Sequence, residues 1–245
     1  MWWRKHAPAR YVLLSDTHAP ATNLRAFEAA LDFIDWSQPE RIFHLGDNFD
    51  TYWLMSYAKM ISSSRREAMV ETELEMGAMI WRELAKRSKQ PAVVMLGNHE
   101  DRWATTMAKY RDLSAYCESP YDRIADEIEN LELLDRAEIR VPNPPFPDFW
   151  ARRGDRSSSV AAGAARGDAV KGFISSIQGH GHGHGFTWLS GEIFAIEAGH
   201  LIDLDHEIMA YDPRNAMRTN KAHTGIVWVD VDGVPHTESL ERMAA

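Results

Sequence analysis

The sequence contains little cysteine and no long apolar run, and both absences narrow the class of protein. Cys117 is the single cysteine among 245 residues, so no disulfide can form within the chain, and we expect a reducing compartment. No segment approaches the roughly 20 apolar residues of a membrane span. The opening residues, MWWRKHAPAR, lack the apolar stretch of a secretory signal. These features predict a soluble, cytoplasmic protein.

The chain also lacks an excess of basic charge. It carries 27 Lys and Arg residues against 36 Asp and Glu residues, a formal net charge of −9. Nonspecific wrapping of duplex nucleic acid depends on Lys and Arg side chains at the phosphates, so this balance opposes it. The same balance leaves open a nucleotide, or the end of a strand, that is held at a metal ion.

Hydrophobic residues make up 44% of the chain, enough for a substantial core. The first hundred residues alternate short apolar runs, typical of buried strands, with amphipathic segments. Strands are expected at 11–15, 42–45 and 93–96, and helices at 23–36 and 65–89. One face of the first helix carries Leu24, Phe27, Leu31 and Ile34, and Asn23 is the expected N-cap. This alternation predicts an α/β sheet.

The remaining residues predict further elements in a less regular order. We expect interrupted helix over 101–135, a Pro-rich loop at 142–148, and a loop at 151–168 that leads into a short helix. Strands are expected at 173–178, 187–199 and 224–240, the last with a turn at Asp232-Gly233. Since no internal repeat and no clear linker interrupts the sequence, residues 1–245 are predicted to form one domain.

Four of the expected strands end in side chains that bind metal ions. The four clusters are Asp16-x-His18, Gly46-Asp47-x-x-Asp50, Gly97-Asn98-His99-Glu100 and Gly179-His180-Gly181-His182. Ligands collect at the carboxyl ends of strands in open α/β sheets, so we expect all four at one edge. Each cluster alone fits a turn, a helix cap or an ordinary loop. Four in order, each after a strand, favour a metal site.

The same clusters carry a resemblance to a known family. DTH at 16–18, GDNFD at 46–50, GNHE at 97–100 and GHGH at 179–182 resemble the signature blocks of calcineurin-like metallophosphoesterases, and GNHEDR resembles their phage and bacterial members. The resemblance covers the chain from Tyr11 to about His182. It implies an α/β fold, a four-layer α/β/β/α sandwich of two mixed β-sheets flanked by helices, with two metal ions at one edge.

The resemblance also implies an enzyme, a metal-dependent hydrolase of phosphoester bonds, and a set of metal ligands. It assigns Asp16, His18 and His182 to the first metal, Asn98 and His180 to the second, and Asp47 to a bridge between them. Two divalent ions can hold the phosphoryl oxygens together with a bridging hydroxide. Oxygen and nitrogen ligands without thiolate suit Mn²⁺ best, with Zn²⁺, Fe or Ni²⁺ as alternatives.

His99 and Asp50 match residues that the family uses beside the leaving group. The resemblance implies that His99 donates a proton to the departing oxygen or stabilises its charge, and that Asp50 orients His99. The alternative for Asp50 is a carboxylate behind the ligands or at a helix cap. With His180 and His182 as the pair of ligands, His184 has no role as a ligand. The alternative is that the pair of ligands is His182 and His184.

The chain departs from the family at one position. Family members usually have one more histidine on the second metal, yet no histidine occurs between His99 and His180. Arg153-Gly154-Asp155 lies at the place in the sequence where a His-Gly-Asp would supply that histidine. An arginine cannot ligate a cation, although Arg153 can contact a substrate phosphate. The alternatives left open are a weak or absent second metal, or a substitute from among His184, His200, His206 and His223.

The favoured activity is that of a phosphodiesterase or nuclease acting on nucleotides or nucleic-acid ends. This expectation follows from the resemblance to phage and bacterial members. The alternatives are a phosphomonoesterase, including a protein phosphatase, and a degenerate metal-binding protein without turnover. A phosphoester is the expected partner and a membrane is not, and the oligomeric state stays open.

Overall fold

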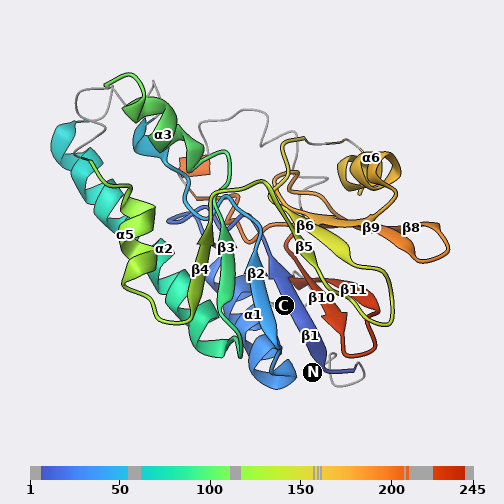
Figure 1. The fold of residues 1–245 in the computed structure, drawn as a ribbon. Helices are drawn as coiled ribbons and strands as arrows, with labels where there is room; N and C mark the ends of the chain where they lie inside the picture. Colours follow the sequence, from blue (N-terminus) through green and yellow to red (C-terminus); the bar gives the residue numbers. More distant parts are fainter. Residues whose placement is uncertain are drawn as a thin grey trace.

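Two β-sheets pack face to face across an apolar core in the computed structural model (Figure 1). The structure describes residues 7–54, 62–110, 117–156, 158, 160, 162–206, 208–209 and 223–240. Tyr11, Leu13 and Phe43 from one sheet meet Phe149, Ile177 and Ile196 from the other in this core. A core that both sheets share supports the prediction of one domain, which stays a prediction because both ends of the chain lie outside the described residues.

The first sheet contains six strands in the order β11-β10-β1-β2-β3-β4. They are β1 (Ala9–Leu14), β2 (Arg41–His44), β3 (Ala92–Met95), β4 (Leu131–Leu134), β10 (Gly225–Asp230) and β11 (Pro235–Ser239). The strands β1 to β4 run parallel, and β10 pairs antiparallel with β1. The expected turn at Asp232-Gly233 joins β10 to β11 and is confirmed.

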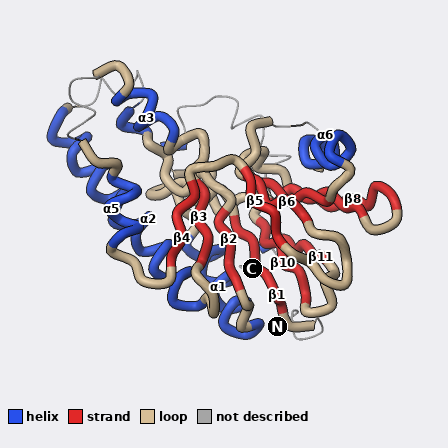
Figure 2. Tube along the Cα trace, viewed as in Figure 1, coloured by secondary structure: helices blue, strands red, loops and turns tan. Residues whose placement is uncertain are grey.

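The second sheet contains five strands in the order β5-β6-β7-β9-β8. They are β5 (Glu138–Val141), β6 (Phe149–Arg152), β7 (Ser175–Gln178), β8 (His184–Ser190) and β9 (Ile193–Ala198). The central strands β6, β7 and β9 run parallel, with β5 and β8 antiparallel at the edges. The N–H of His180, just after β7, donates to Asp16, just after β1, so the carboxyl ends of these two strands meet. Figure 2 shows loops gathered above the strands β2, β3 and β4.

Helices cover the outer faces of both sheets and complete the four layers. The helices α1 (Leu24–Ser37), α2 (Ser63–Arg87) and α5 (Pro120–Asp126) pack on the first sheet, and α6 (Gly163–Gly172) packs on β7 and β9. Two short helices, η2 (Tyr52–Leu54) and α3 (Asp101–Met107), follow β2 and β3. The expected four-layer α/β/β/α sandwich is confirmed. In the described part of the chain no helix is long and apolar enough to cross a bilayer.

Asn23 caps α1 as expected, but the predicted buried face was partly wrong. The Asn23 side chain accepts a hydrogen bond from the N–H of Ala26 at 3.1 Å. Leu24, expected in the core, is 45% exposed, whereas Phe33 is fully buried. The buried stripe runs through Phe27, Ala30 and Ile34, and Leu24 lies one turn before it, where the chain is still entering the helix.

Other expected boundaries were also wrong. Residues 131–134, expected within helix, form β4, because pairing with β3 buries Leu134 against the second sheet. Residues 151–152, expected in a loop, complete β6 by pairing with β5 and β7. Phe173, expected to open a strand, ends α6 instead, and it is 83% exposed. In each case contacts between distant segments outweigh the local pattern.

Candidate metal centre

The loops that follow β1, β2 and β7 are joined by hydrogen bonds around a single centre. The N–H of Asp16 donates to Gly46 O and the N–H of His18 donates to Asp47 O, each at 3.1 Å. The N–H of His180 donates to Asp16 Oδ2 at 2.9 Å, which ties the loop after β7 to the loop after β1. The four clusters expected at one edge of the molecule therefore do meet there.

Two glycines make this convergence possible. A Cβ at Gly97 would lie 2.0 Å from Asp47 Oδ1, and a Cβ at Gly179 would lie 1.9 Å from Ser15 Oγ. Neither neighbour can give way, because both are part of the buried loops around the centre. Any larger residue at either position would push the loops apart, so the glycines of GNHE and GHGH are steric requirements.

The backbone is strained at this centre. Five non-glycine residues of the four clusters have positive φ angles between 45° and 67°, namely Asp16, His18, Asp47, His180 and His182. This left-handed conformation costs an L-residue roughly 1–2 kcal/mol. Strain of this kind persists where surrounding contacts hold it, and it concentrates at functional sites. Here it turns five potential ligand side chains toward one another.

Asp16, His18 and His182 form one group that could hold a metal ion. His182 Nε2 lies 3.2 Å from Asp16 Oδ1, and His18 Nε2 lies 3.8 Å from the same oxygen. His18 Nδ1 lies 3.0 Å from Asp50 Oδ1, so its proton belongs on Nδ1, with the Nε2 lone pair facing Asp16. A carboxylate behind a histidine orients the ring of a metal ligand in this way.

The donor atoms of this group fit a cation. Asp16 Oδ1 and His18 Nε2 are fully buried and accept no hydrogen bond from any residue that the structure describes. Burial alone raises the pKa of Asp16, but His18 and His182 outweigh it and hold the pKa well below its usual range. Burial likewise lowers the pKa of His18, but Asp16 and Asp50 outweigh it and raise the pKa to about 10. The centre therefore attracts positive charge.

Asp47, Asn98 and His180 form the other half of the centre. His180 Nδ1 lies 3.4 Å from Asp47 Oδ2. The amide oxygen of Asn98 faces both acceptors; with the amide turned, its nitrogen would donate to Asp47 Oδ2 at 3.0 Å and to His180 Nδ1 at 2.7 Å. Asn98 thus contacts both Asp47 and His180, and an amide, a carboxylate and an imidazole are all groups that a divalent cation takes as ligands. These three residues therefore also fit a metal ion.

Asp47 lies between the two halves. Burial raises the pKa of Asp47, but His99 and His180 outweigh it and lower the pKa to about 2. Asp47 also belongs to a second group, with His18 and His99, whose potential ligand atoms lie within 4.8 Å of one another. A carboxylate in this place can reach an ion on either side, as the expected bridge requires.

His99 lies at the edge of the centre, beside Asp50. His99 Nδ1 is 2.8 Å from the backbone oxygen of Asp50 and 3.3 Å from its Oδ1. The same Oδ1 also contacts His18, so Asp50 stands behind both histidines. Burial, followed by the nearby His18, lowers the pKa of His99. Arg102 Nη2 lies 3.1 Å from His99 Nε2, a contact that the sequence analysis did not foresee.

Two buried glutamates brace these loops, and sequence reasoning did not assign them this part. Glu100, the last residue of GNHE, accepts hydrogen bonds from the N–H groups of Phe49 at 2.8 Å and Gly97 at 2.5 Å. Burial, with nearby Asp47, raises the pKa of Glu100 to about 7. Glu73 of α2 accepts from the N–H of Thr51 at 2.8 Å. Glu73 lies far from the motifs in the sequence, and no pattern there predicts its hydrogen bond to Thr51.

Arg153 lies where the sequence offers no histidine. The ideal Cβ position of Gly46 is 3.2 Å from Arg153 Cβ, so Arg153 borders the centre. Its guanidinium turns to Asp101, 2.8 Å away, and to Leu96 O at 3.0 Å. Asp101 therefore already neutralises the charge of the Arg153 guanidinium. The role of Arg153 in binding a substrate phosphate stays a prediction.

The other histidines offered as substitutes do not join either group of potential ligands among the described residues. His184 begins β8 and lies against Gly225, whose ideal Cβ would be 2.4 Å from His184 Cδ2. His200 is buried with its ring 5.6 Å from that of His182, and its Nδ1 accepts from Ile202 N–H. Burial lowers the pKa of His200 to about 3.

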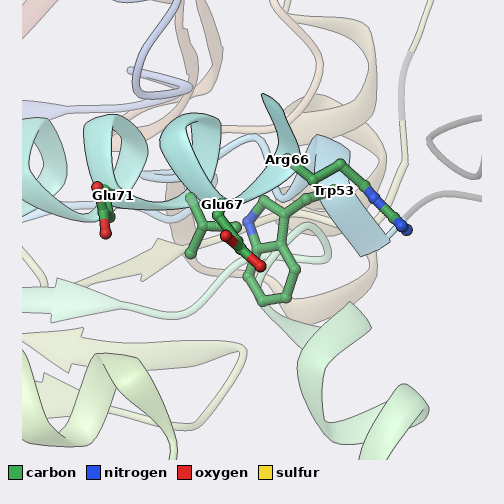
Figure 3. Close-up of a pocket in the computed structure, with 5 residues that line it drawn as sticks. Trp53, Arg66, Glu67 and Glu71 are labelled. Carbon is green, nitrogen blue, oxygen red and sulfur yellow. The ribbon is translucent and has the colours of Figure 1, made fainter. Parts of the chain in front are cut away.

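Two open cavities lie between η2 and α2 and share Trp53 and Val70. One of about 390 Å³ is lined by Trp53 and by the α2 residues Arg66, Glu67, Val70 and Glu71, which Figure 3 draws as sticks. The other, of about 370 Å³, is lined by Trp53, Val70, Leu74, Trp103, Glu118, Ser119, Pro120 and Arg123. The Trp53 and Trp103 rings are 6.0 Å apart, and both line this second cavity.

The fold and the candidate metal centre are those of a metal-dependent hydrolase. Carboxylates, an amide and imidazoles lie together at the ends of strands from two packed sheets. The sequence profile of the calcineurin-like phosphoesterases matches residues 9–195. The chain belongs to this family and is a metal-dependent hydrolase acting on phosphoester bonds. Family members typically bind two divalent metal ions, and the two halves of this centre suit that number.

Solved structures match the chain at low sequence identity. A single-site variant of Vps29 from Entamoeba histolytica is 12% identical, with a TM-score of 0.42, and the match covers 94% of this chain and 97% of that one. The protein TT1561 of Thermus thermophilus is 11% identical, with a TM-score of 0.43, and the match covers 95% of this chain and 99% of that one. No curated protein matches the chain in sequence.

Proposed function

We propose that this phosphoesterase is a Mn²⁺-dependent phosphodiesterase that acts on nucleotides or on the ends of nucleic acids. The observation that carries the metal-dependent part is Asp47, whose buried carboxylate lies near His180 and also within one group of potential ligands with His18 and His99. When bound, two divalent ions would neutralise the phosphoryl oxygens and generate a nucleophile from water. Ligands made of carboxylate, amide and imidazole without thiolate suit Mn²⁺.

In this proposal the chain's residues divide the work as the family resemblance implies. Asp16, His18 and His182 would hold the first ion, and Asn98 and His180 would hold the second. Asp47 would be the ligand that the two ions share. The buried Asp16 Oδ1 and His18 Nε2, which have no hydrogen-bond partner among the described residues, support the first set, and the contact of Asn98 with Asp47 and His180 supports the second.

His99 and Asp50 then act on the side of the leaving group. His99 borders the centre without completing either set of three ligands, and Asp50 holds its Nδ1. We expect His99→Ala to lower kcat by roughly 10²–10⁴, the usual value of a group that donates a proton to the departing oxygen or stabilises its charge, with metal content nearly unchanged. Kinetics together with elemental analysis of the variant measure both. A loss of metal would make His99 a ligand, as its closeness to His18 and Asp47 permits.

The proposal of a nucleotide substrate is supported by two indoles on η2 and α3, the short helices that follow Asp50 and His99 in the chain. Stacking of a base on an aromatic side chain contributes about 1–3 kcal/mol, and Trp53 and Trp103 both line one open cavity. Trp103→Ala should therefore raise KM for a dinucleotide more than for a methyl phosphodiester. Trp188→Ala, an exposed indole on β8, is the matched control.

Hydrolysis of bis-p-nitrophenyl phosphate and of p-nitrophenyl phosphate, with a panel of divalent metals, tests the proposal. We expect turnover of the diester, the highest rate with Mn²⁺, and none after dialysis into EDTA. Turnover of the monoester alone would favour a phosphomonoesterase, the first alternative. Tight metal binding without either activity would indicate a binding protein. Full activity in excess EDTA would overturn metal dependence altogether.

A further inference from the structure

Two arginines border the candidate centre, and their partners differ in charge. Arg153 forms an ion pair with Asp101 at 2.8 Å. Arg102 donates from Nη1 to the backbone oxygen of Asp50 at 2.6 Å, and from the same nitrogen to Thr51 Oγ1 at 3.2 Å. Among the residues that the structure describes, no acidic side chain forms a salt bridge with Arg102. A half-buried cation with neutral partners gains most from an anionic ligand.

The contact between Arg102 and His99 also defines where the proton on His99 lies. A guanidinium only donates hydrogen bonds, so at 3.1 Å the Nε2 atom of His99 accepts from Arg102 Nη2. The proton of the neutral ring is then on Nδ1, which lies 2.8 Å from the oxygen of Asp50. In this arrangement the N–H groups beside Nε2 belong to Arg102, so His99 acts on the departing oxygen by holding the guanidinium that stabilises its charge.

We propose that Arg102 is a catalytic residue whose guanidinium hydrogen-bonds the departing oxygen of the phosphoester. This inference rests on the proposed function and deepens it. A hydroxide oxygen forms the new bond to phosphorus, and the bond from phosphorus to the leaving oxygen breaks. The leaving oxygen keeps that electron pair as an oxyanion bound to Arg102, and afterwards it takes a proton from water. Arg102 stays protonated throughout.

The local fold supports this placement. Arg102 lies in the first turn of α3, three residues after His99, and its N–H donates to the backbone oxygen of His99 at 3.2 Å, which keeps the two residues together. Thr51 Oγ1 donates to the backbone oxygen of His99 at 2.8 Å and accepts from Arg102, which holds the guanidinium against the loop after β2. The next residue, Trp103, lines one of the open cavities.

The test is a series of methyl aryl phosphodiesters whose phenols span a wide range of pKa, assayed with Mn²⁺. We expect Arg102→Ala to lower kcat by about 10²–10³ for the least acidic phenol, the usual cost of removing one oxyanion donor, and far less for the most acidic. The plot of log kcat against the pKa of the phenol becomes steeper. Arg102→Lys restores part of the rate for the poor leaving groups, because it keeps the charge.

Arg82→Ala is the matched control, because Arg82 is an exposed arginine on α2 that lies 3.9 Å from Glu127 and away from the motifs. We expect it to match the wild-type protein throughout the series. If Arg102→Ala lowers kcat equally for all phenols, or if it loses bound metal, Arg102 supports the structure and the inference is wrong.

Binding of inorganic phosphate to the Mn²⁺-loaded protein, measured by calorimetry, separates this inference from the proposed function. If the wild-type protein hydrolyses no member of the series, the proposed function fails, and phosphate binding still decides about Arg102. At least tenfold weaker binding in Arg102→Ala, with Arg82→Ala unchanged, would support an anion-binding guanidinium. Equal binding in both variants would overturn it.

Discussion

The two halves of the candidate metal centre differ in how fully the chain encloses them. Asp16 and His18 are almost completely buried, whereas the His180 side chain is 25% exposed. The first half contains a carboxylate and two histidines, and the second contains an amide, one histidine and the shared Asp47. The side chains of the first half are therefore more fully buried than His180 of the second half. Substrate can approach the centre from the side of His180.

This difference has consequences for metal affinity. A site of buried, pre-oriented ligands loses little conformational freedom when an ion binds, so the first half should bind its ion more tightly than the second. Arg153 beside the second half adds a further reason, because it supplies no lone pair where the family usually has a histidine. The predictions below test this ranking, from the largest expected effect to the smallest.

The change Asp47→Asn removes the carboxylate that both halves share. We expect loss of both ions and a fall in kcat/KM of roughly 10³-fold or more, because metal ions supply several kcal/mol of charge stabilisation in the transition state. Elemental analysis and diester kinetics measure the two effects. Asp35→Asn is the control, an exposed carboxylate paired with Arg87, and should behave as wild type. Two tightly held ions in Asp47→Asn would exclude the bridge.

The histidines of the GHGH loop should separate the two halves. We expect His182→Ala to weaken the tighter ion, and His180→Ala to weaken only the looser one. Each loss should exceed the roughly 10- to 100-fold that removal of an outer partner of a metal ligand costs. Titration with Mn²⁺ resolves the two affinities. If both variants weaken the binding of the same Mn²⁺ ion, the two halves are not distinct sites.

The change Arg153→His places an imidazole where the second half lacks one. We expect tighter binding of the second ion, on the order of tenfold, provided that the loop keeps its course beside Gly46. Arg153→Ala is the matched control, because it also removes the ion pair with Asp101 but adds no ligand. Equal affinities in the two variants would show that this position does not reach the ion.

The smallest effect is expected for His184→Ala. His184 lies in β8 against Gly225, outside both groups of potential ligands in the described part of the chain. Its removal should change transition-state stabilisation by under about 1 kcal/mol, roughly a fivefold change in kcat/KM. Damage as severe as that in His180→Ala would instead make His184 the missing ligand and shift the register of the GHGH pair.

Much of the fold could be predicted, because the first half of the chain has regular local patterns. The strands that end at Asp16, Asp47 and Asn98 are short apolar runs bounded by polar residues, and the structure confirms all three. The strands β4, β5 and β6 lie in short mixed segments whose pairing depends on partners elsewhere in the chain. Leu24 was expected inside because periodicity defines a helical face but not how far the core extends along it.

By itself, the sequence determined which residue types stand at the carboxyl ends of the strands, and therefore the family and its metal chemistry. Only the tertiary structure decided how these residues meet. In the tertiary structure Arg153 forms an ion pair with Asp101, and Arg102 contacts His99 Nε2. Asp50 contacts both His18 and His99. The physical reason is that residue types and strand ends follow from local pattern, whereas the partner of each polar atom depends on angles and distances between loops that are far apart in the chain.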